Sequence, residues 1–193
     1  MIEKDHGIYD AMNKGIFLAS GDVIGFLHAD DVFANSFVLK DICEVFENNQ
    51  TIHAVYGDLN YVKNDNVNNI VRSWKSCSFN KGLLKKGWMP PHPTLYLKKD
   101  WIKKVKGFNS NYKISSDYDF ILKLFNYSNF ISYYIPKVLV KMRVGGVSNK
   151  SFKNILKKSS EDLRILRNNG FSFIGSIVTL CLKNISKLSQ YLY

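Results

Sequence analysis

The stretch from Gly21 to Asp31 constrains this chain more than any other segment. An apolar run at residues 23–27 predicts a buried strand, and two adjacent carboxylates, Asp30 and Asp31, follow it closely. In open α/β sheets, ligands bind where strands end and loops diverge. Neighbouring carboxylates repel each other unless a cation or hydrogen-bond donors neutralise them. The pattern indicates a divalent-metal site or, in the simpler alternative, a strand end that caps the next helix.

Hydrophobic periodicity predicts an alternation of helices and strands along the chain. The expected helices cover residues 9–19, 35–46 (with Asn35 as N-cap), 81–86, 100–105, 118–126 (capped by Ser115 or Ser116), 152–168 and 173–192. The expected strands cover residues 23–27, 52–56, 94–97, 130–135 and 138–143, with a polar hairpin at 58–71. Strand–helix–strand order of this kind is typical of an α/β fold with a parallel sheet.

Length and composition fit one main domain. The chain has 193 residues and 46% apolar content, which is enough to bury a substantial core. We expect the main domain at residues 1–150 and a C-terminal helical appendage at residues 151–193.

Cysteine usage and the absence of targeting patterns indicate the compartment. Cys43, Cys77 and Cys181 are widely spaced and form no C-x-x-C pair, so neither a disulfide framework nor a zinc knuckle is indicated. The residues after Met1 do not resemble a signal peptide, and no run reaches the about 20 apolar residues of a membrane span. We expect a cytoplasmic protein, with peripheral attachment to the inner face of the cell membrane as a further expectation.

Charge is distributed very unevenly along the chain. Residues 1–65 carry 4 basic and 11 acidic side chains, whereas residues 66–193 carry 23 basic and 5 acidic ones. A field of this kind implies an anionic partner for the C-terminal part. Lysine dominates, while readout of base edges favours arginine, so nucleic acid is not expected as a partner. An anionic membrane surface or a lipid-linked diphosphate acceptor fits better, unless the lysine content is only a compositional bias.

Several motifs, in order, resemble those of glycosyltransferase family 2. They are residues 7–15 (GIYDAMNKG), 25–31 (GFLHADD), 92–94 (HPT), 107–109 (GFN), 115–120 (SSDYDF) and 145–148 (GGVS). The resemblance covers roughly the first three quarters of the chain. It implies the A-type (GT-A), Rossmann-like fold of nucleotide-diphospho-sugar transferases. Relatives begin with a nucleobase-binding βαβ unit, and this chain starts at the helix after it, so the resemblance implies an N-terminally truncated domain.

The resemblance also implies an activity. It is the inverting, metal-dependent transfer of one sugar, of the hexosyltransferase type, from a nucleotide-sugar donor to a saccharide or lipid-linked acceptor. Such enzymes serve cell-envelope and polysaccharide biosynthesis, with Mn²⁺ or Mg²⁺ as cofactor. The Q-x-x-R-W motif of processive synthases is absent, which favours transfer of a single sugar. The alternatives are an inactive, truncated remnant or a basic membrane-binding module.

Matching motif positions suggest roles for individual residues. Asp30 corresponds to the last acid of the family's metal motif and is the expected metal ligand. Asp117 corresponds to the family's general base, which takes the proton of the acceptor hydroxyl; alternatively it only caps its helix. Asp119 is expected to form a surface pair. His92, in a proline-rich loop, is expected on the acceptor side, or else is structural.

The donor-binding side chains that the resemblance suggests are His28, Asp31, Arg143, Asn13 and Lys14. His28 stands where many relatives have Asp or Asn, and it either contacts ribose or a metal-bound water, or only packs. Asp31 could equally cap the turn that follows it. Arg143 precedes a glycine loop and is suited to bidentate phosphate contact. Asn13 and Lys14 lie beside the nucleotide in relatives, or else on a solvated helix face.

Overall fold

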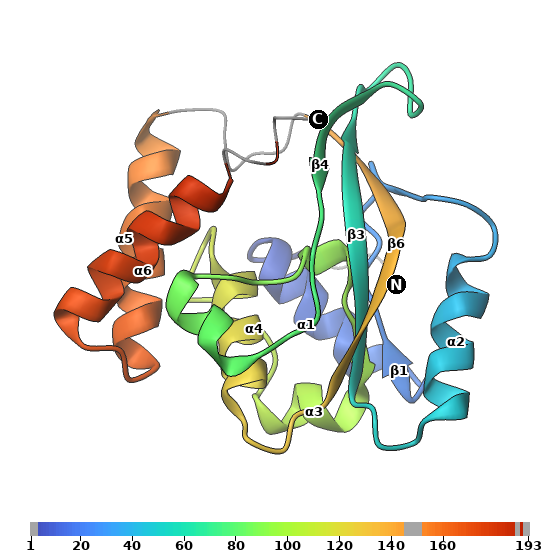
Figure 1. Cartoon of the computed structure of the whole chain (residues 1–193), viewed down its shortest axis with the longest axis horizontal. Helices are drawn as coiled ribbons and strands as arrows, with labels where there is room; N and C mark the ends of the chain where they lie inside the picture. The colour runs from blue at the N-terminus through green and yellow to red at the C-terminus, as the bar shows by residue number, and fades with distance from the viewer. Residues whose placement is uncertain (1–3, 145–151, 188–189, 191–193) are drawn as a thin grey trace.

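The computed structural model describes residues 4–144, 152–187 and 190 (Figure 1). The helices are α1 (Ile8–Leu18), α2 (Val38–Asn48), α3 (Lys99–Lys104), α4 (Ser116–Asn126), α5 (Phe152–Asn168) and α6 (Phe173–Ser186), with 3₁₀ turns η1 (Lys81–Lys86) and η2 (His92–Thr94). The strands are β1 (Val23–Ile24), β2 (Val32–Phe33), β3 (Ala54–Val62), β4 (Ile70–Trp74), β5 (Tyr96–Lys98) and β6 (Ser132–Arg143). The mixture of helices and strands confirms the predicted α/β class.

The strands form one mixed sheet. Their order is β1-β5-β3-β6-β2, and β4 pairs with β3 outside this path. Only the β3–β6 pair is parallel among the described strands; the other pairs are antiparallel. The expectation of a parallel sheet is therefore wrong for most of it. Strand β5 pairs with β3, β2 with β6, and β1 with β5, all in antiparallel fashion, which needs no helical crossover within each pair.

The centre of the sheet is the long pair β3 and β6. Strand β3 is buried along almost its whole length, as expected for a strand covered on both faces. A Cβ atom at Gly57 would lie 2.6 Å from the Leu139 side chain, so the close approach of the two strands requires glycine. The two strands predicted at 130–135 and 138–143 form the single strand β6. Its register shifts near Pro136, which cannot donate a ladder hydrogen bond.

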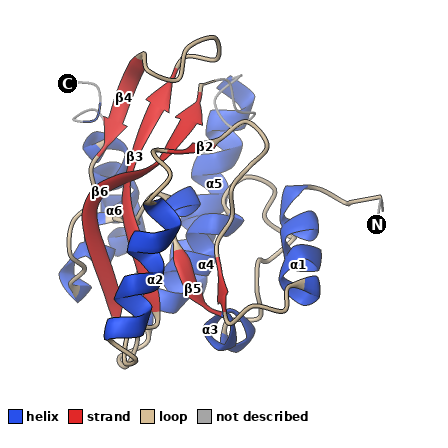
Figure 2. Cartoon of the chain, turned by 90° about the vertical axis from the view of Figure 1, so that its right-hand side faces the viewer, coloured by secondary structure: helices blue, strands red, loops and turns tan. Residues whose placement is uncertain are grey.

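Helices cover both faces of the sheet (Figure 2). On one face, α2 packs through Val38, Ile42 and Phe46 against β3 and β6. On the other face, α1, α3 and α4 form the main core with side chains of β1, β3 and β5. Helix α1 contributes Tyr9, Met12 and Ile16 to the core, and Met12 and Ile16 recur at the helical spacing that the sequence predicts.

The C-terminal helices pack on this second face. Helix α5 lies against α4, and α6 lies against η1 and α5. Ile165 and Leu166 of α5 are fully buried in the main core. The Ser172 side chain caps α6 by accepting a hydrogen bond from the Gly175 N–H (3.1 Å). Helix α6 ends at Ser186, earlier than expected, and most residues beyond it lie outside the described part of the chain.

Two element boundaries near the acidic pair differ from the prediction. Strand β1 ends at Ile24 because only Val23 and Ile24 pair with β5. The expected N-cap Asn35 accepts a hydrogen bond from the Phe37 N–H (2.8 Å), but the helix begins later, with Phe37 at the N-cap position. The acidic pair consequently lies in a connection between β1 and β2, and not directly at the end of a long strand.

Candidate active site

The acidic pair forms a tight turn. The Asp31 N–H donates a hydrogen bond to the His28 carbonyl oxygen (2.9 Å), and β2 begins immediately afterwards. Strand β2 pairs with β6, placing Val32 opposite Lys141 and holding the turn close to the end of β6. The Asp30 side chain is exposed, and no hydrogen bond or ion pair engages its carboxylate within the described residues. This carboxylate is therefore available to a ligand.

Arg143, the last residue of β6, braces the same turn. Its Nη1 donates to the Asp30 carbonyl oxygen (2.6 Å), and its Nε donates to the Asn64 carbonyl oxygen (3.2 Å). The guanidinium thus binds the backbone of the turn and brings a positive charge beside both carboxylates. The glycine loop at residues 145–148, expected near the diphosphate, lies outside the described residues.

Asp31 is the buried member of the pair. Its side chain is 7% exposed, and its Oδ2 has no hydrogen-bond partner among the described residues. Burial raises the pKa of the Asp31 carboxyl, and the charge of Asp30 acts in the same direction. His28 and Arg143 oppose that increase. A buried carboxylate oxygen without a protein partner is satisfied by a water, a proton or a cation.

The donor set is compatible with a hard divalent cation. No group of three or more His, Cys, Asp or Glu side chains that could hold a metal occurs in the described ranges. Mg²⁺ and Mn²⁺ nevertheless bind with one or two carboxylates when substrate phosphates and water complete the shell. An exposed carboxylate at Asp30 and an unpartnered oxygen at Asp31 fit a site completed by a diphosphate.

His92 lies at the start of η2 and is buried among aromatic rings. Its ring centroid is 5.9 Å from that of Phe26 and 5.5 Å from that of Phe108. The His28 ring lies 6.1 Å away. Burial lowers the pKa of His92 to about 4, with a smaller contribution from His28, while Asp117 opposes the shift. His92 is therefore a neutral imidazole at physiological pH.

Asp117 lies in the first turn of α4 and is partly exposed. Ser115 is the N-cap residue, but its side chain makes no capping hydrogen bond. The Tyr9 hydroxyl of α1 donates to the Ile114 carbonyl oxygen (2.7 Å) and lies 3.2 Å from Asp117 Oδ1. Burial raises the pKa of Tyr9, and so does the charge of Asp117, so this hydroxyl stays protonated.

Asp119 is buried, and the expectation of a surface position is wrong. Its side chain is 1% exposed and pairs with Lys123 (2.5 Å), one turn along α4. Asn169, at the end of α5, also donates to it (3.3 Å). The spacing of four residues predicts the ion pair between Asp119 and Lys123. The burial of Asp119 was not predicted, because it arises from the packing of α5 against α4.

The two α1 residues of the predicted site make contacts within the protein. Asn13 donates to the Phe108 carbonyl oxygen (2.8 Å) and accepts from the Phe108 N–H (2.9 Å). Gly107 has φ +63°, and a Cβ there would lie 2.6 Å from Asn13 Oδ1. Lys14 pairs with Asp5 (3.1 Å) and Asp10 (3.3 Å). Asn13 therefore braces the loop beside His92, and Lys14 neutralises acids at the start of α1.

The structure brings most of the predicted residues into one region. Asp30, Asp31 and Arg143 gather at the turn. His28 lies beside this turn with its ring 6.1 Å from that of His92, and the charge of Asp117 acts on His92. Sequence reasoning missed Tyr9 as a site residue, although it lies within the quoted α1 motif and carries a hydroxyl on an otherwise apolar helix face. It also missed Glu161 of α5, which binds the loop before α4 and which no local sequence signal indicated.

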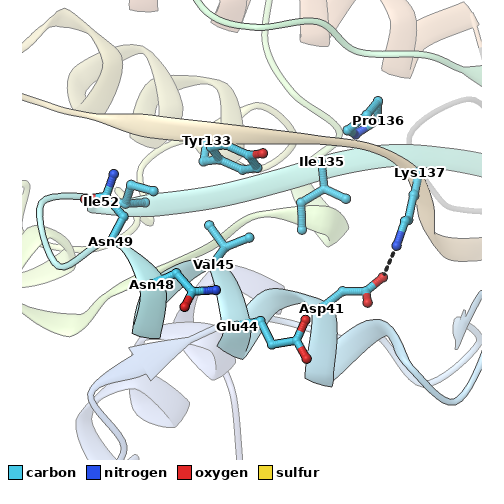
Figure 3. Close-up of a pocket in the computed structure, with 10 residues that line it drawn as sticks. All are labelled: Asp41, Glu44, Val45, Asn48, Asn49, Ile52, Tyr133, Ile135, Pro136 and Lys137. Atoms are coloured by element: carbon cyan, nitrogen blue, oxygen red, sulfur yellow. Dashed lines mark hydrogen bonds and ion pairs between the residues drawn. The ribbon is translucent and has the colours of Figure 1, made fainter.

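A separate pocket lies away from these residues. It has a volume of about 390 Å³ and lies between α2 and β6 (Figure 3). Its rim carries the ion pair between Lys137 and Asp41 (2.8 Å). None of the predicted site residues lines it. The polar groups suited to chemistry therefore lie outside this pocket.

The fold is that of the A-type nucleotide-sugar transferases. The solved structures most useful for comparison are S. aureus TarS 1-349 in complex with UDP-GlcNAc and the mannosyltransferase PcManGT from Pyrobaculum calidifontis in complex with GDP-Man and Mn²⁺. Their TM-scores are 0.60 and 0.55, each with 14% sequence identity and coverage of 98% of this chain. The matches cover 55% of the TarS chain and 53% of the PcManGT chain.

Sequence comparison identifies the family. The profile of glycosyl transferase family 2 matches residues 2–111, more than half of the chain, and the chain belongs to this family. A PGL/p-HBAD biosynthesis glycosyltransferase of Mycobacterium bovis BCG is 26% identical over 165 residues, covering 84% of this chain and 62% of the relative. An uncharacterised glycosyltransferase of Mycobacterium tuberculosis is 31% identical over 123 residues, covering 63% of this chain and 45% of the relative. The chain thus spans less than two thirds of the length of these relatives.

Proposed function

We propose that this glycosyltransferase transfers one sugar, with inversion, from a nucleotide diphosphate donor to a saccharide or lipid-linked acceptor in cell-envelope or polysaccharide assembly. The observation that carries the proposal is the position of His28. His28 precedes the acidic turn, where a diphosphate and cation would bind, and its ring lies 6.1 Å from that of His92, whose imidazole also feels the charge of Asp117. A leaving-group site near His28 and a base near His92 suit direct displacement of the diphosphate by the acceptor hydroxyl.

Asp117 is the proposed general base. Its carboxylate takes the proton of the acceptor hydroxyl while the new C–O bond forms at the anomeric carbon. The bond between that carbon and the diphosphate oxygen breaks on the opposite side, so the configuration inverts. The Tyr9 hydroxyl makes a weak hydrogen bond to this carboxylate (3.2 Å), and the buried, neutral imidazole of His92 adds no positive charge near it.

Asp30 and Asp31 are the proposed ligands of Mn²⁺ or Mg²⁺. The cation, when bound, neutralises charge on the leaving diphosphate. Arg143 adds a positive charge to the same turn. The PcManGT complex with Mn²⁺ supports the choice of ion, and the TarS and PcManGT complexes with UDP-GlcNAc and GDP-Man support a UDP- or GDP-sugar donor.

An anionic membrane surface is the proposed location of the acceptor. Helix α6 exposes an apolar face, with side chains between 40% and 74% exposed: Phe173, Ile174, Ile177, Val178, Leu182 and Ile185. Arg167 lies 5.9 Å from the Phe173 ring, and η1 carries exposed Lys85 and Lys86 beside α6. Apolar side chains flanked by basic ones are typical of helices that lie in a membrane interface. No helix within the described residues is long and apolar enough to cross a membrane.

Release of nucleoside diphosphate from UDP- and GDP-sugars tests the proposed reaction. We expect release with Mn²⁺ or Mg²⁺, loss of release with EDTA, and loss with Asp30→Asn while the fold is retained by circular dichroism. Glu44→Gln, which alters an exposed acid of α2, is the control and should retain activity. Metal-independent release, or full activity of Asp30→Asn, would contradict the role of the turn. Anionic-membrane binding with no turnover of any donor would favour a membrane-binding module instead.

A further inference from the structure

Glu161 of α5 makes an unusual set of contacts for a residue in a C-terminal helix. Its carboxylate is buried and accepts three backbone hydrogen bonds from one loop. The Lys113 N–H donates to Oε1 (3.0 Å), while the Ile114 N–H (2.9 Å) and Ser115 N–H (3.0 Å) donate to Oε2. Its side chain is 6% exposed. Hydrogen bonds to an ionised carboxylate are about twice as strong as neutral ones, so this loop is held firmly.

The same loop controls the hydrogen bonding of Asp117. Its Ile114 carbonyl oxygen accepts the Tyr9 hydroxyl at 2.7 Å, whereas that hydroxyl lies 3.2 Å from Asp117 Oδ1. A phenolic hydroxyl has one proton to donate. The shorter contact to Ile114 therefore takes the larger share of that proton, and the hydrogen bond from Tyr9 to Asp117 Oδ1 is the weaker of the two.

We propose that Glu161 is a positioning residue for the reaction: it fixes the loop of residues 113–115 so that Tyr9 donates mainly to Ile114 and only weakly to Asp117, whose carboxylate stays available as a base. This inference rests on the proposed role of Asp117. It assigns a catalytic contribution to α5, which the sequence alone places in a separate appendage.

The physical consequence of losing Glu161 follows from these contacts. Without its carboxylate, three partly buried N–H groups lose their acceptor and the loop relaxes. The Ile114 carbonyl oxygen then moves relative to Tyr9, and the hydroxyl donates instead to Asp117. A hydrogen bond to the charged form of a carboxyl lowers its pKa and weakens it as a base. The donor site at the acidic turn is unaffected, because Glu161 makes no contact there.

The test compares Glu161→Gln with wild type and with Glu44→Gln, the same chemical change at an exposed acid of α2. Gln keeps one acceptor oxygen but presents an amide NH₂ to the remaining loop N–H. The reaction is release of UDP from UDP-GlcNAc, or of GDP from GDP-mannose, with Mn²⁺ across pH 4–9. We expect kcat to fall about 10- to 100-fold with KM for the donor nearly unchanged, as for a misplaced catalytic group. The acidic limb of the kcat profile should move to lower pH.

Two further variants separate positioning from stability. Glu161→Asp keeps the charge on a shorter side chain, and its kcat should lie between those of wild type and Glu161→Gln. Adding Tyr9→Phe to Glu161→Gln removes the redirected hydroxyl and should return the acidic limb towards its wild-type position. Backbone amide exchange at residues 113–115 should accelerate in Glu161→Gln but not in Glu44→Gln.

The outcomes distinguish this inference from the proposed function. A Glu161→Gln protein with faster exchange at residues 113–115 but wild-type kcat and pH profile would overturn the positioning role alone. Unchanged amide exchange would overturn the contact itself. If wild type turns over neither donor, the proposed function fails and the role of Glu161 fails with it.

Discussion

The Arg143 guanidinium donates a 2.6 Å hydrogen bond to the backbone carbonyl oxygen of Asp30, 113 residues earlier in the chain. Because Arg143 binds the carbonyl and not the carboxylate, the Asp30 side chain stays exposed. The contact thus holds the turn in shape and adds positive charge without occupying the proposed cation ligand.

Replacing Arg143 should weaken binding of nucleoside diphosphates. In Arg143→Gln we expect about a tenfold or greater loss of affinity for UDP or GDP with Mn²⁺, because a hydrogen bond from a charged donor contributes roughly 1.5–3 kcal/mol. Isothermal titration calorimetry measures the loss. Arg167→Gln on α5 removes the same charge away from the turn and should bind as wild type does. Equal losses in both variants would mean that only net charge matters.

Replacing Asp117 should slow turnover and leave donor binding intact. Asp117→Asn is nearly isosteric and keeps an oxygen near the Tyr9 hydroxyl, so the fold should persist. Loss of a general base lowers kcat by about 10²- to 10⁴-fold. Steady-state kinetics and calorimetry with the same donor measure the two properties. If the variant partly unfolds but its folded fraction has normal specific activity, Asp117 only stabilises the start of α4 and is not the base.

Burial of His92 predicts a pH-dependent stability. Its pKa in the folded protein is lowered to about 4, below the usual 6.5, so between these values the unfolded chain binds more protons. The contribution to stability is present above pH 6.5 and is lost as pH falls towards 4, by up to about 3 kcal/mol. Denaturant unfolding of wild type and His92→Gln across this range measures it. The variant should show a smaller loss; parallel curves would contradict the prediction.

Breaking the buried ion pair between α5 and α6 by removing one charge should be strongly destabilising. Lys183 Nζ lies 2.8 Å from Asp162 Oδ2 and 3.2 Å from the centroid of the Tyr118 ring, and both charged side chains are nearly inaccessible. Lys183→Met leaves Asp162 as an unpaired buried acid and should cost about 3–5 kcal/mol. Adding Asp162→Leu should recover much of that loss, as urea unfolding can show. A single variant as stable as wild type would mean that the charges are not buried in solution.

The exposed face of α6 should direct binding to anionic bilayers. Co-sedimentation at low salt should be strong with vesicles rich in phosphatidylserine and weak with phosphatidylcholine vesicles, and should fall as salt rises. The double variant Ile174→Ser/Val178→Ser should bind less, whereas Phe17→Ser, which alters an exposed aromatic residue of α1, should not. Equal binding to both vesicle types would rule out the electrostatic part.

Local sequence patterns were sufficient for the two helices that carry candidate site residues, α1 and α4. The apolar spacing of Met12 and Ile16 predicts α1, and the acids of α4 follow a serine pair that marks its start. The identities of Asp30, His92 and Asp117 as candidates came from ordered motifs, and the structure brings them into one region. These features depend on residues close together in the chain, where helical and strand periodicity are expressed directly.

Contacts between distant segments could not be read from such patterns. The antiparallel pairing of β1, β2 and β5, the Arg143 contact with Asp30, and the Glu161 contact with residues 113–115 each join segments far apart in sequence. In the sequence, Asp119 and Lys183 resemble ordinary surface charges. In the structure both are buried, Asp119 beside Asn169 and Lys183 beside Asp162 of α5. The sequence by itself determined the helices, the buried strands and the chemically competent side chains. The tertiary structure decided strand direction, burial and hydrogen-bond partners, because these depend on how the whole chain packs and not on neighbours in sequence.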